Sequence, residues 1–272
     1  MSTVADGTDL GLFGPDSVAW RLHQDPSMLI GGMRALLVQA LNPLAMAAVA
    51  QHSDFRDDPW GRLRRTSDFV ATTIFGDTRA ARAAGARVRA IHKAIRGVDD
   101  VTGLPYRADD PELLLWIHGV EVHSFLTAYR RYGGRLEDAD ADLYVAEMVR
   151  AAELVGLHAS DVPATLDDLR TYLRGVKNLC VTPAAREGLR LVLNPPVALP
   201  GRILWTVPAA AAVAILPRRV RDLYGLLWFE PADPAVRLAA SSACRTLRVL
   251  LPPPPVVRDA LERARASAAE AA

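Results

Sequence analysis

Residues 77–97 read DTRAARAAGARVRAIHKAIRG, and this stretch is typical of one structure, the α-helix. Asp77 is a residue type that caps helix N-termini, and the alanines and arginines that follow it are good helix formers. Gly97 is the residue type that most often ends a helix. The stretch therefore predicts a helix that begins after Asp77, runs to Arg96 and stops at Gly97.

The same signals recur along the chain, whereas the period-two alternation of half-buried strands is nearly missing. Further helices are predicted over residues 14–23, 27–51, 61–75, 111–133, 137–155, 163–175, 182–193, 201–216, 218–227, 233–251 and from 256 onward. Only residues 98–109 form an extended loop. We expect a single all-α domain over residues 1–272, because a chain of 272 residues is long enough to bury one sizeable core.

Composition excludes several classes of protein. Half of the residues are apolar and 23% are charged, which is ordinary for a globular protein and excludes a disordered chain. Lys and Arg number 32 against 31 Asp and Glu, and a net charge of +1 gives no reason to expect a nucleic-acid partner. The two cysteines, Cys180 and Cys244, are too few for a disulfide framework and too far apart for a zinc motif. They favour free thiols in a reducing cytoplasm.

The sequence shows no targeting or membrane-spanning segment. The start, MSTVADGTDLG, lacks the basic and apolar regions of a signal peptide. The apolar stretches 28–50 and 203–216 are interrupted by polar residues or by Pro208, so neither offers about 20 uninterrupted apolar residues. We expect buried core helices and a cytoplasmic location, and we leave open a peripheral contact of one face with a membrane.

Generic catalytic motifs are missing from the sequence, so the histidines carry the chemical signal. His118 and His123 are five residues apart, about 140° around a helix, and cannot face one metal ion as a pair. Arg89, His92 and Arg96 instead fall within about 60° of arc on the predicted helix. An imidazole between two guanidinium groups suits a flat anionic ligand that contains a metal. The alternative is an exposed arginine face with one incidental histidine.

A second cluster lies on the predicted helix 61–75. Arg62, Arg65 and Thr66 share about 100° of arc, and Phe69 and Val70 extend that face by one turn. A patch of donors that passes into apolar surface could line one side of a pocket. A solvated basic turn is the alternative.

Two more side chains are candidates for the same pocket. His118 lies on an apolar helix face, as either a buried, hydrogen-bonded histidine or a pocket residue, and Glu121 one turn on could fix its tautomer. Tyr106 lies in the extended loop, where it either packs the loop or turns its hydroxyl into the pocket.

Taken in order, six short stretches resemble the DUF2236 family, which includes latex-clearing rubber oxygenases and the MpaB-type oxygenases of fungal meroterpenoid pathways. The matching stretches are GPDSVAW (14–20), GMRALLVQ (32–39), DPWGRLRRT (58–66), FG (75–76), RxxHxxxRG (89–97) and GxxYxADDP leading to WIH (103–118). The resemblance covers residues 12–150 well and is weaker through the C-terminal helical part, 176–272.

The resemblance implies a globin-like helical core around haem b, with peripheral helices outside it. It places the proximal iron ligand at His92 and the distal side at Arg62, Arg65 and Thr66. The remaining arginines of the His92 motif, Arg89 and Arg96, would pair with the haem propionates or steady His92. Arg65 could hydrogen-bond O₂ or peroxide on the distal side, with Thr66 assisting.

Three departures from the rubber oxygenases bear on the substrate. Arg65 stands where they have lysine, and arginine cannot lose its proton to coordinate iron. The predicted helix 27–51 has no Asp or Glu where they carry an acidic residue, and Asn42-Pro43 stands where many relatives have His-Pro. The rubber enzymes are also secreted. We therefore do not expect cleavage of polyisoprene itself.

The resemblance therefore implies a haem b-dependent oxidoreductase that activates O₂ or peroxide. The family and the apolar content of the chain favour a hydrophobic small molecule as the substrate, such as an alkene, a terpenoid or a lipid-like compound. Three alternatives remain open. They are a haem-binding sensor or carrier without turnover, a haem-free all-α binding module, and a non-haem copper or iron enzyme.

Overall fold

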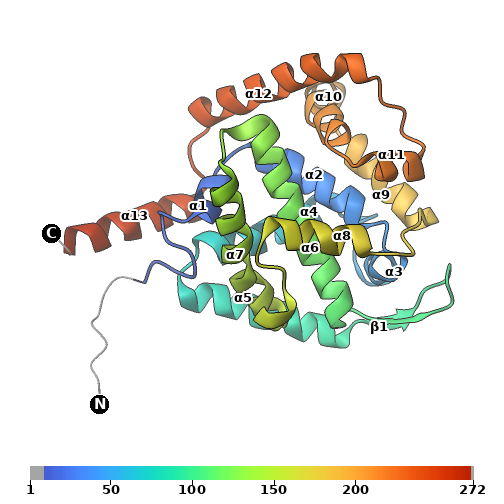
Figure 1. The fold of residues 1–272 in the computed structure, drawn as a ribbon, viewed down its shortest axis with the longest axis horizontal. Coiled ribbons are helices and arrows are strands. Elements are labelled where there is room, and N and C mark those ends of the chain that lie inside the picture. Colours follow the sequence, from blue (N-terminus) through green and yellow to red (C-terminus); the bar gives the residue numbers. More distant parts are fainter. Residues whose placement is uncertain (1–8, 271–272) are drawn as a thin grey trace.

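Two helices, α2 (Ser27–Gln39) and α6 (Pro111–Ala128), pack along each other at the centre of the molecule (Figure 1). A glycine makes their close approach possible, because a Cβ on Gly31 would lie 2.8 Å from Cδ1 of Phe125. The structure, a computed structural model, describes residues 9–270.

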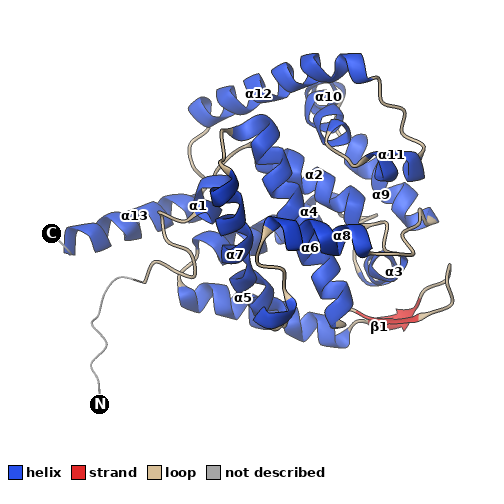
Figure 2. Ribbon diagram, viewed as in Figure 1, coloured by secondary structure: helices blue, strands red, loops and turns tan. Residues whose placement is uncertain are grey.

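The other elements surround this pair and confirm the all-α class (Figure 2). The remaining α-helices are α1 (Val18–His23), α3 (Pro43–His52), α4 (Pro59–Phe75), α5 (Thr78–Ala94), α7 (Asp138–Val155), α8 (Leu166–Gly175), α9 (Pro183–Leu193), α10 (Leu199–Ala214), α11 (Arg218–Tyr224), α12 (Asp233–Leu250) and α13 (Pro255–Glu270). A short π-helical segment, η1 (Tyr129–Gly133), continues α6, and the 3₁₀ turns η2 (Ala159–Asp161) and η3 (Glu230–Ala232) precede α8 and α12. Strands β1 (Arg96–Val98) and β2 (Pro105–Arg107) form a small antiparallel hairpin, in which Gly97 lies opposite Tyr106.

The single helix predicted over residues 27–51 is wrong, because the chain forms two helices, α2 and α3, that meet at 105°. Asn42 begins the second helix. Its side-chain oxygen accepts hydrogen bonds from the backbone N–H groups of Leu44 and Ala45, each at 3.1 Å. Pro43 occupies the first turn, where its missing N–H leaves no partner unsatisfied.

The helix predicted to reach Arg96 ends instead at Ala94. The start is as predicted, since Asp77 accepts a hydrogen bond from the Ala80 N–H at 2.6 Å. At the other end the chain turns into β1, which pairs with part of the predicted loop 98–109. Arg96 therefore lies on a strand, and the helical arc expected for Arg89, His92 and Arg96 does not form.

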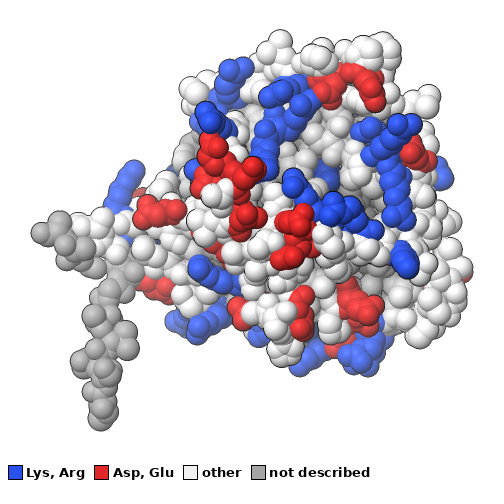
Figure 3. Space-filling model, viewed as in Figure 1, with Lys and Arg blue, Asp and Glu red and all other residues white. Residues whose placement is uncertain are grey.

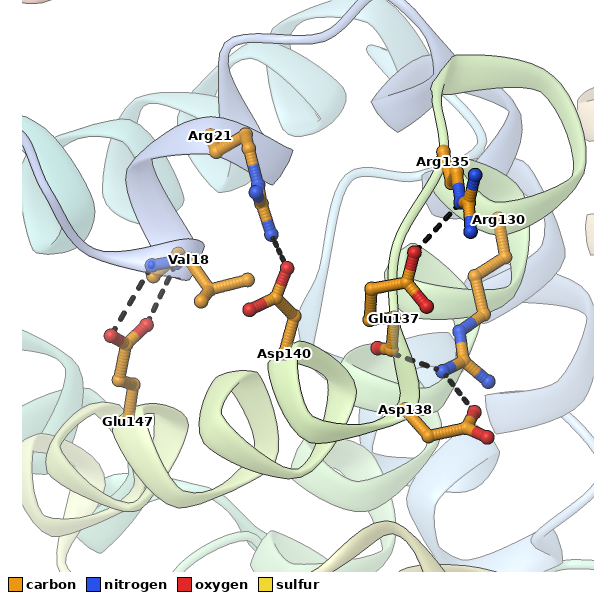
Figure 4. A network of polar contacts seen from close by, with 9 residues as sticks. Val18, Arg21, Arg130, Arg135, Glu137, Asp138, Asp140 and Glu147 are labelled. Atoms are coloured by element: carbon orange, nitrogen blue, oxygen red, sulfur yellow. Dashed lines mark hydrogen bonds and ion pairs between the residues drawn. The ribbon is translucent and has the colours of Figure 1, made fainter.

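A buried carboxylate fixes α1 against α7 (Figure 4). Glu147 of α7 accepts hydrogen bonds from the backbone N–H groups of Val18 at 3.2 Å and Ala19 at 2.8 Å. These are among the N–H groups that a helix leaves unsatisfied in its first turn, where negative charge is also favourable. On the surface, Arg21 and Asp140 form an ion pair at 2.5 Å between the same two helices.

Helices α4 and α5 form a hairpin around Gly76-Asp77, and its two ends differ. At the closed end, beside the turn, Ile74 and Phe75 are buried in the core, as is Ala81 of α5. The indole Nε1 of Trp20 donates to the Ile74 carbonyl at 2.9 Å, and its ring meets Phe75 edge-on at 5.4 Å. At the open end, residues 62–72 of α4 and 86–94 of α5 include no buried side chain. We use the terms closed end and open end in this sense below.

Within residues 9–270 no helix by itself has the length and apolar character to cross a membrane; only the bent pairs α2–α3 and α10–α11 reach these values together. The face shown in Figure 3 carries basic and acidic side chains scattered over the same surface. Cys180 and Cys244 are free thiols, as expected.

Candidate functional site

His92 lies at the last turn of α5, on the open end of the hairpin. Its side chain is half-buried, and its Nδ1 atom is buried without a hydrogen-bond partner among the described residues. Burial lowers the pKa of His92 below its ordinary value of 6.5, and the charge of Asp109 opposes that shift. The imidazole is therefore mostly neutral at pH 7, which is the form that binds metals.

The arginines predicted to flank His92 have separate positions. The Arg89 guanidinium donates a hydrogen bond to the Leu154 carbonyl and so ties α5 to α7. Arg96, on β1, is exposed, and the only hydrogen bond of its side chain within the described residues is one of 3.4 Å from Nε to the Lys93 carbonyl. Arg89 is thus committed to holding the helix, whereas Arg96 keeps its guanidinium available.

The side chains of the second predicted cluster, Arg62, Arg65 and Thr66, also have different surroundings. Arg62 is half-buried, and burial, followed by the nearby charge of Arg65, lowers the pKa of its guanidinium. Arg65 is exposed and forms ion pairs with Asp58 at 3.3 Å and Asp54 at 3.9 Å. Thr66 donates from Oγ1 to the Arg62 carbonyl at 3.1 Å, within its own helix. Of the three side chains, Arg62 is the most enclosed.

The start of α4 explains how Arg62 is held. Asp58 caps the helix, because its Oδ1 accepts a hydrogen bond from the Gly61 N–H at 2.8 Å, and Pro59 occupies the first turn. A Cβ at residue 61 would lie 1.8 Å from the Asp58 carboxylate, so this cap requires glycine. Arg62 follows directly on a fixed turn.

Helix α6 places His118 and Glu121 one turn apart in the interior. Burial lowers the pKa of His118 to about 4 and raises that of Glu121 to about 7. Both side chains keep some accessible surface. The structure shows no hydrogen bond between them, so the predicted role of Glu121 in fixing the His118 tautomer is not supported.

Tyr106 packs against α3 in the structure. The side chain is buried, and its hydroxyl donates to Oε1 of Gln51 at 2.6 Å and lies 3.1 Å from Nε2 of His52. Tyr106 therefore holds the β-hairpin against α3. The structure does not direct it toward the other candidates.

An apolar rim adjoins the open end. Trp60, at the start of α4, is 40% exposed and meets Trp205 of α10 edge-on at 5.8 Å. Ile203 and Leu204, which precede Trp205 on α10, are 63% and 77% exposed. Large exposed apolar side chains beside polar ones are typical of a binding surface.

In the part of the chain that the structure describes, no three His, Cys, Asp or Glu side chains gather in a way that could hold a metal ion. A haem requires only one such ligand from the protein. The antiparallel hairpin brings His92, at the end of α5, and Arg62, near the start of α4, to the same end of the molecule. Arg62 and His92 form the candidate site, and His118 of α6 remains a predicted pocket residue.

Comparison with known proteins identifies the family of the chain. The family model described as "ER-bound oxygenase mpaB/B'/Rubber oxygenase, catalytic domain" matches residues 20–249. The chain belongs to this family. Membership of the MpaB/rubber oxygenase family indicates an oxygenase, and it confirms the resemblance seen in the sequence motifs.

A solved structure of the latex clearing protein, in its closed state, shares the helical fold. The TM-score is 0.60 at 18% sequence identity, and the match covers 92% of this chain and 72% of that one. No curated protein sequence matches the chain.

Proposed function

We propose that this member of the MpaB/rubber oxygenase family is a haem b-dependent oxygenase that uses O₂ or peroxide to oxidise a hydrophobic small molecule of the alkene, terpenoid or lipid-like class. One observation carries the proposal. His92 is a neutral, half-buried imidazole with an unpartnered ring nitrogen, and it lies at the open end of a helical hairpin.

The residues present fit a haem group. His92 would hold the iron, and Arg96, whose guanidinium is exposed, would pair with a propionate. Arg89 would position His92 indirectly, since its bond to Leu154 fixes the helix that carries the imidazole. When bound, the haem would supply the activation of the oxidant, which amino-acid side chains cannot provide.

The protein's own contribution would be orientation and polarity. Arg62 would donate hydrogen bonds to an oxygen atom of the oxidant, because it is the most enclosed donor on α4. Arg65 would act at the mouth of the site, where its ion pairs with Asp54 and Asp58 hold the first turns of α4. Phe69 and Val70, half-buried one to two turns further along, would exclude water.

The apolar rim favours a hydrophobic substrate. Trp60, Ile203 and Leu204 place exposed apolar surface next to the start of α4. An apolar molecule that approached the site would bury this surface, which is favourable by about 25 cal/mol per Å².

The test combines a spectrum with turnover. The wild-type protein, expressed with a haem precursor, should show a Soret band and consume O₂ or peroxide when a terpenoid or unsaturated lipid is added. His92→Ala should lose the band and the activity, whereas the control His158→Ala, an exposed histidine, should keep both. A folded wild-type protein that takes up no haem would overturn the proposal.

A haem-binding sensor or carrier is the second candidate. Arg65 and Thr66 already have partners on their own helix or its cap, and α2 and α3 contain no acidic residue. This candidate predicts the same Soret band with no consumption of oxidant in the presence of any hydrophobic compound.

A further inference from the structure

Arg34 of α2 is a buried cation without a carboxylate partner. The residue is 3% exposed, and burial lowers the pKa of its guanidinium to about 10, so the group still carries its charge at pH 7. No carboxylate oxygen of the described residues lies within 4.0 Å of its nitrogen atoms. A buried charge costs free energy unless opposite charge or hydrogen bonds compensate it. Within the described residues, only neutral groups do so for Arg34.

Three neutral groups contact the Arg34 guanidinium. Nε donates to the Ile215 carbonyl at 3.0 Å, and the two terminal nitrogens lie 2.5 Å from Oγ of Ser124 and 3.2 Å from Nδ1 of His123. Ser124 accepts this bond, because its own proton goes to the Val120 carbonyl at 2.6 Å. A guanidinium has five N–H groups, so two of them have no partner among the described residues.

The contact with Arg34 determines the tautomer of His123. Burial, followed by the charges of Arg34 and Arg170, lowers the pKa of His123 to about 3, so the ring is neutral at pH 7. Arginine can only donate, so Nδ1 is the acceptor and the ring proton lies on Nε2. Nε2 has no hydrogen-bond partner among the described residues, and it is not one of their buried, unpartnered atoms. His123 therefore offers an accessible N–H donor.

Two more arginines add positive charge around this donor. Arg170 belongs to α8, which packs against α6, and it is close enough for its charge to lower the pKa of His123. Arg170 is exposed and has no hydrogen bond or ion pair among the described residues. Arg221 of α11 donates to the Leu216 carbonyl at 2.7 Å, in the same turn at the end of α10 that Arg34 binds. A helix C-terminus carries only about half a negative charge, so this turn does not neutralise the arginines.

The cluster faces away from the predicted pocket residue of α6. His123 and His118 are about 140° apart around the helix. His123 lies between α8, which carries Arg170, and α2, which carries Arg34. In Figure 3 basic side chains lie over α8 and near α11, and the surface between them is hollowed. None of the arginines in the cluster belongs to the Arg62–His92 site.

We propose that Arg34, His123 and Arg170 form a binding site for the oxyanion group of a small molecule, a carboxylate or a phosphate. The oxyanion accepts hydrogen bonds from Nε2–H of His123 and from the Arg170 guanidinium. Arg34 stabilises its charge from behind the imidazole. The ligand thus supplies the negative charge that no described carboxylate provides here. The site does not depend on haem, and it goes beyond the proposed function.

Titration calorimetry of the full chain tests the site with two probes, inorganic phosphate and sodium octanoate, at constant ionic strength. At least one probe should bind with one molecule per chain, and the probe that binds identifies the oxyanion as phosphate or carboxylate. Arg170→Gln should weaken that binding by about tenfold or more, because it removes a charged donor. The control Arg82→Gln removes an exposed arginine of α5 and should bind as wild type. Arg34 itself is buried, so its variants would test folding as well as binding.

A second readout concerns the ring of His123. Nitrogen NMR spectroscopy should show a neutral imidazole with its proton on Nε2, a signal that His123→Gln removes and that the bound probe shifts. A ring proton on Nδ1 would overturn the proposal, as would the absence of saturable binding of both probes to wild type. Wild-type affinity in both Arg170→Gln and His123→Gln would place the bound probe elsewhere and would also overturn it.

Discussion

The closed and open ends of the α4–α5 hairpin are made from the same two helices, yet they serve different purposes. At the closed end Ile74 and Phe75 are buried, and Trp20 donates a hydrogen bond to the backbone carbonyl of Ile74 in the last turn of α4. At the open end the half-buried Arg62 and His92 have few protein partners. One hairpin is thus anchored firmly at its turn, while its far end is left for the ligand that we propose.

The largest expected effect is on the closed end. Phe75→Ala removes a ring that is 3% exposed and should lower the free energy of unfolding by about 3–5 kcal/mol. Phe69→Ala, on the half-buried part of α4, should cost clearly less. Urea unfolding of the haem-free variants measures both. Equal losses would mean that the open end is packed as tightly as the closed end.

The core behind the closed end should also make the protein sensitive to acid. Burial lowers the pKa of His23 to about 3, against 6.5 in the unfolded chain. Below pH 6.5 the unfolded chain therefore binds a proton that the folded protein does not, and stability falls as the pH drops toward 3. His23→Gln should reduce this slope by up to about 1.4 kcal/mol per pH unit. Unfolding in urea at pH 7, 6 and 5 tests this, with the exposed His158→Gln as the control.

At the open end, Arg62 and Arg65 should differ in the haem-loaded protein. Arg62→Gln should reduce turnover by about tenfold or more, because it removes the more enclosed donor. Arg65→Gln should reduce turnover less and lower stability slightly, since exposed ion pairs contribute about 0–1 kcal/mol. Steady-state kinetics of the two variants compare them directly. A larger effect of Arg65 would show that this side chain leaves Asp58 and turns inward when haem binds.

Thr66 should have the smallest effect. Its hydroxyl donates to the Arg62 carbonyl in the same helix, so Thr66→Val should change turnover by less than about twofold. The same kinetic assay measures it. A loss comparable to that of Arg62→Gln would place the Thr66 hydroxyl among the groups that contact the oxidant.

The sequence predicted the helices well where local signals decide the structure. Asp77 caps α5 as predicted, and Asp58 caps α4, where the cap requires Gly61. The break between α2 and α3 was also readable, because Asn42-Pro43 is a helix start. The apolar character of residues 27–51 continues across this break, and it led to the prediction of one helix.

Other features depend on contacts that sequence spacing does not contain. Arg96 leaves the helix because β1 pairs with β2, where it lies opposite Arg107, eleven residues further along the chain. Arg89 was predicted beside a ligand and instead binds Leu154, 65 residues away. For Glu121 one signal was present, an acid in the apolar part of a helix, but the absence of a hydrogen-bond partner among the described residues is visible only in the fold.

The central claim is that the open end of the hairpin binds haem through His92. A titration of haem into the haem-free protein tests this claim most directly. Absorbance in the Soret region should show one haem bound per chain in wild type and in His158→Ala, and no saturable binding in a folded His92→Ala variant. Identical titrations of wild type and His92→Ala would contradict the account.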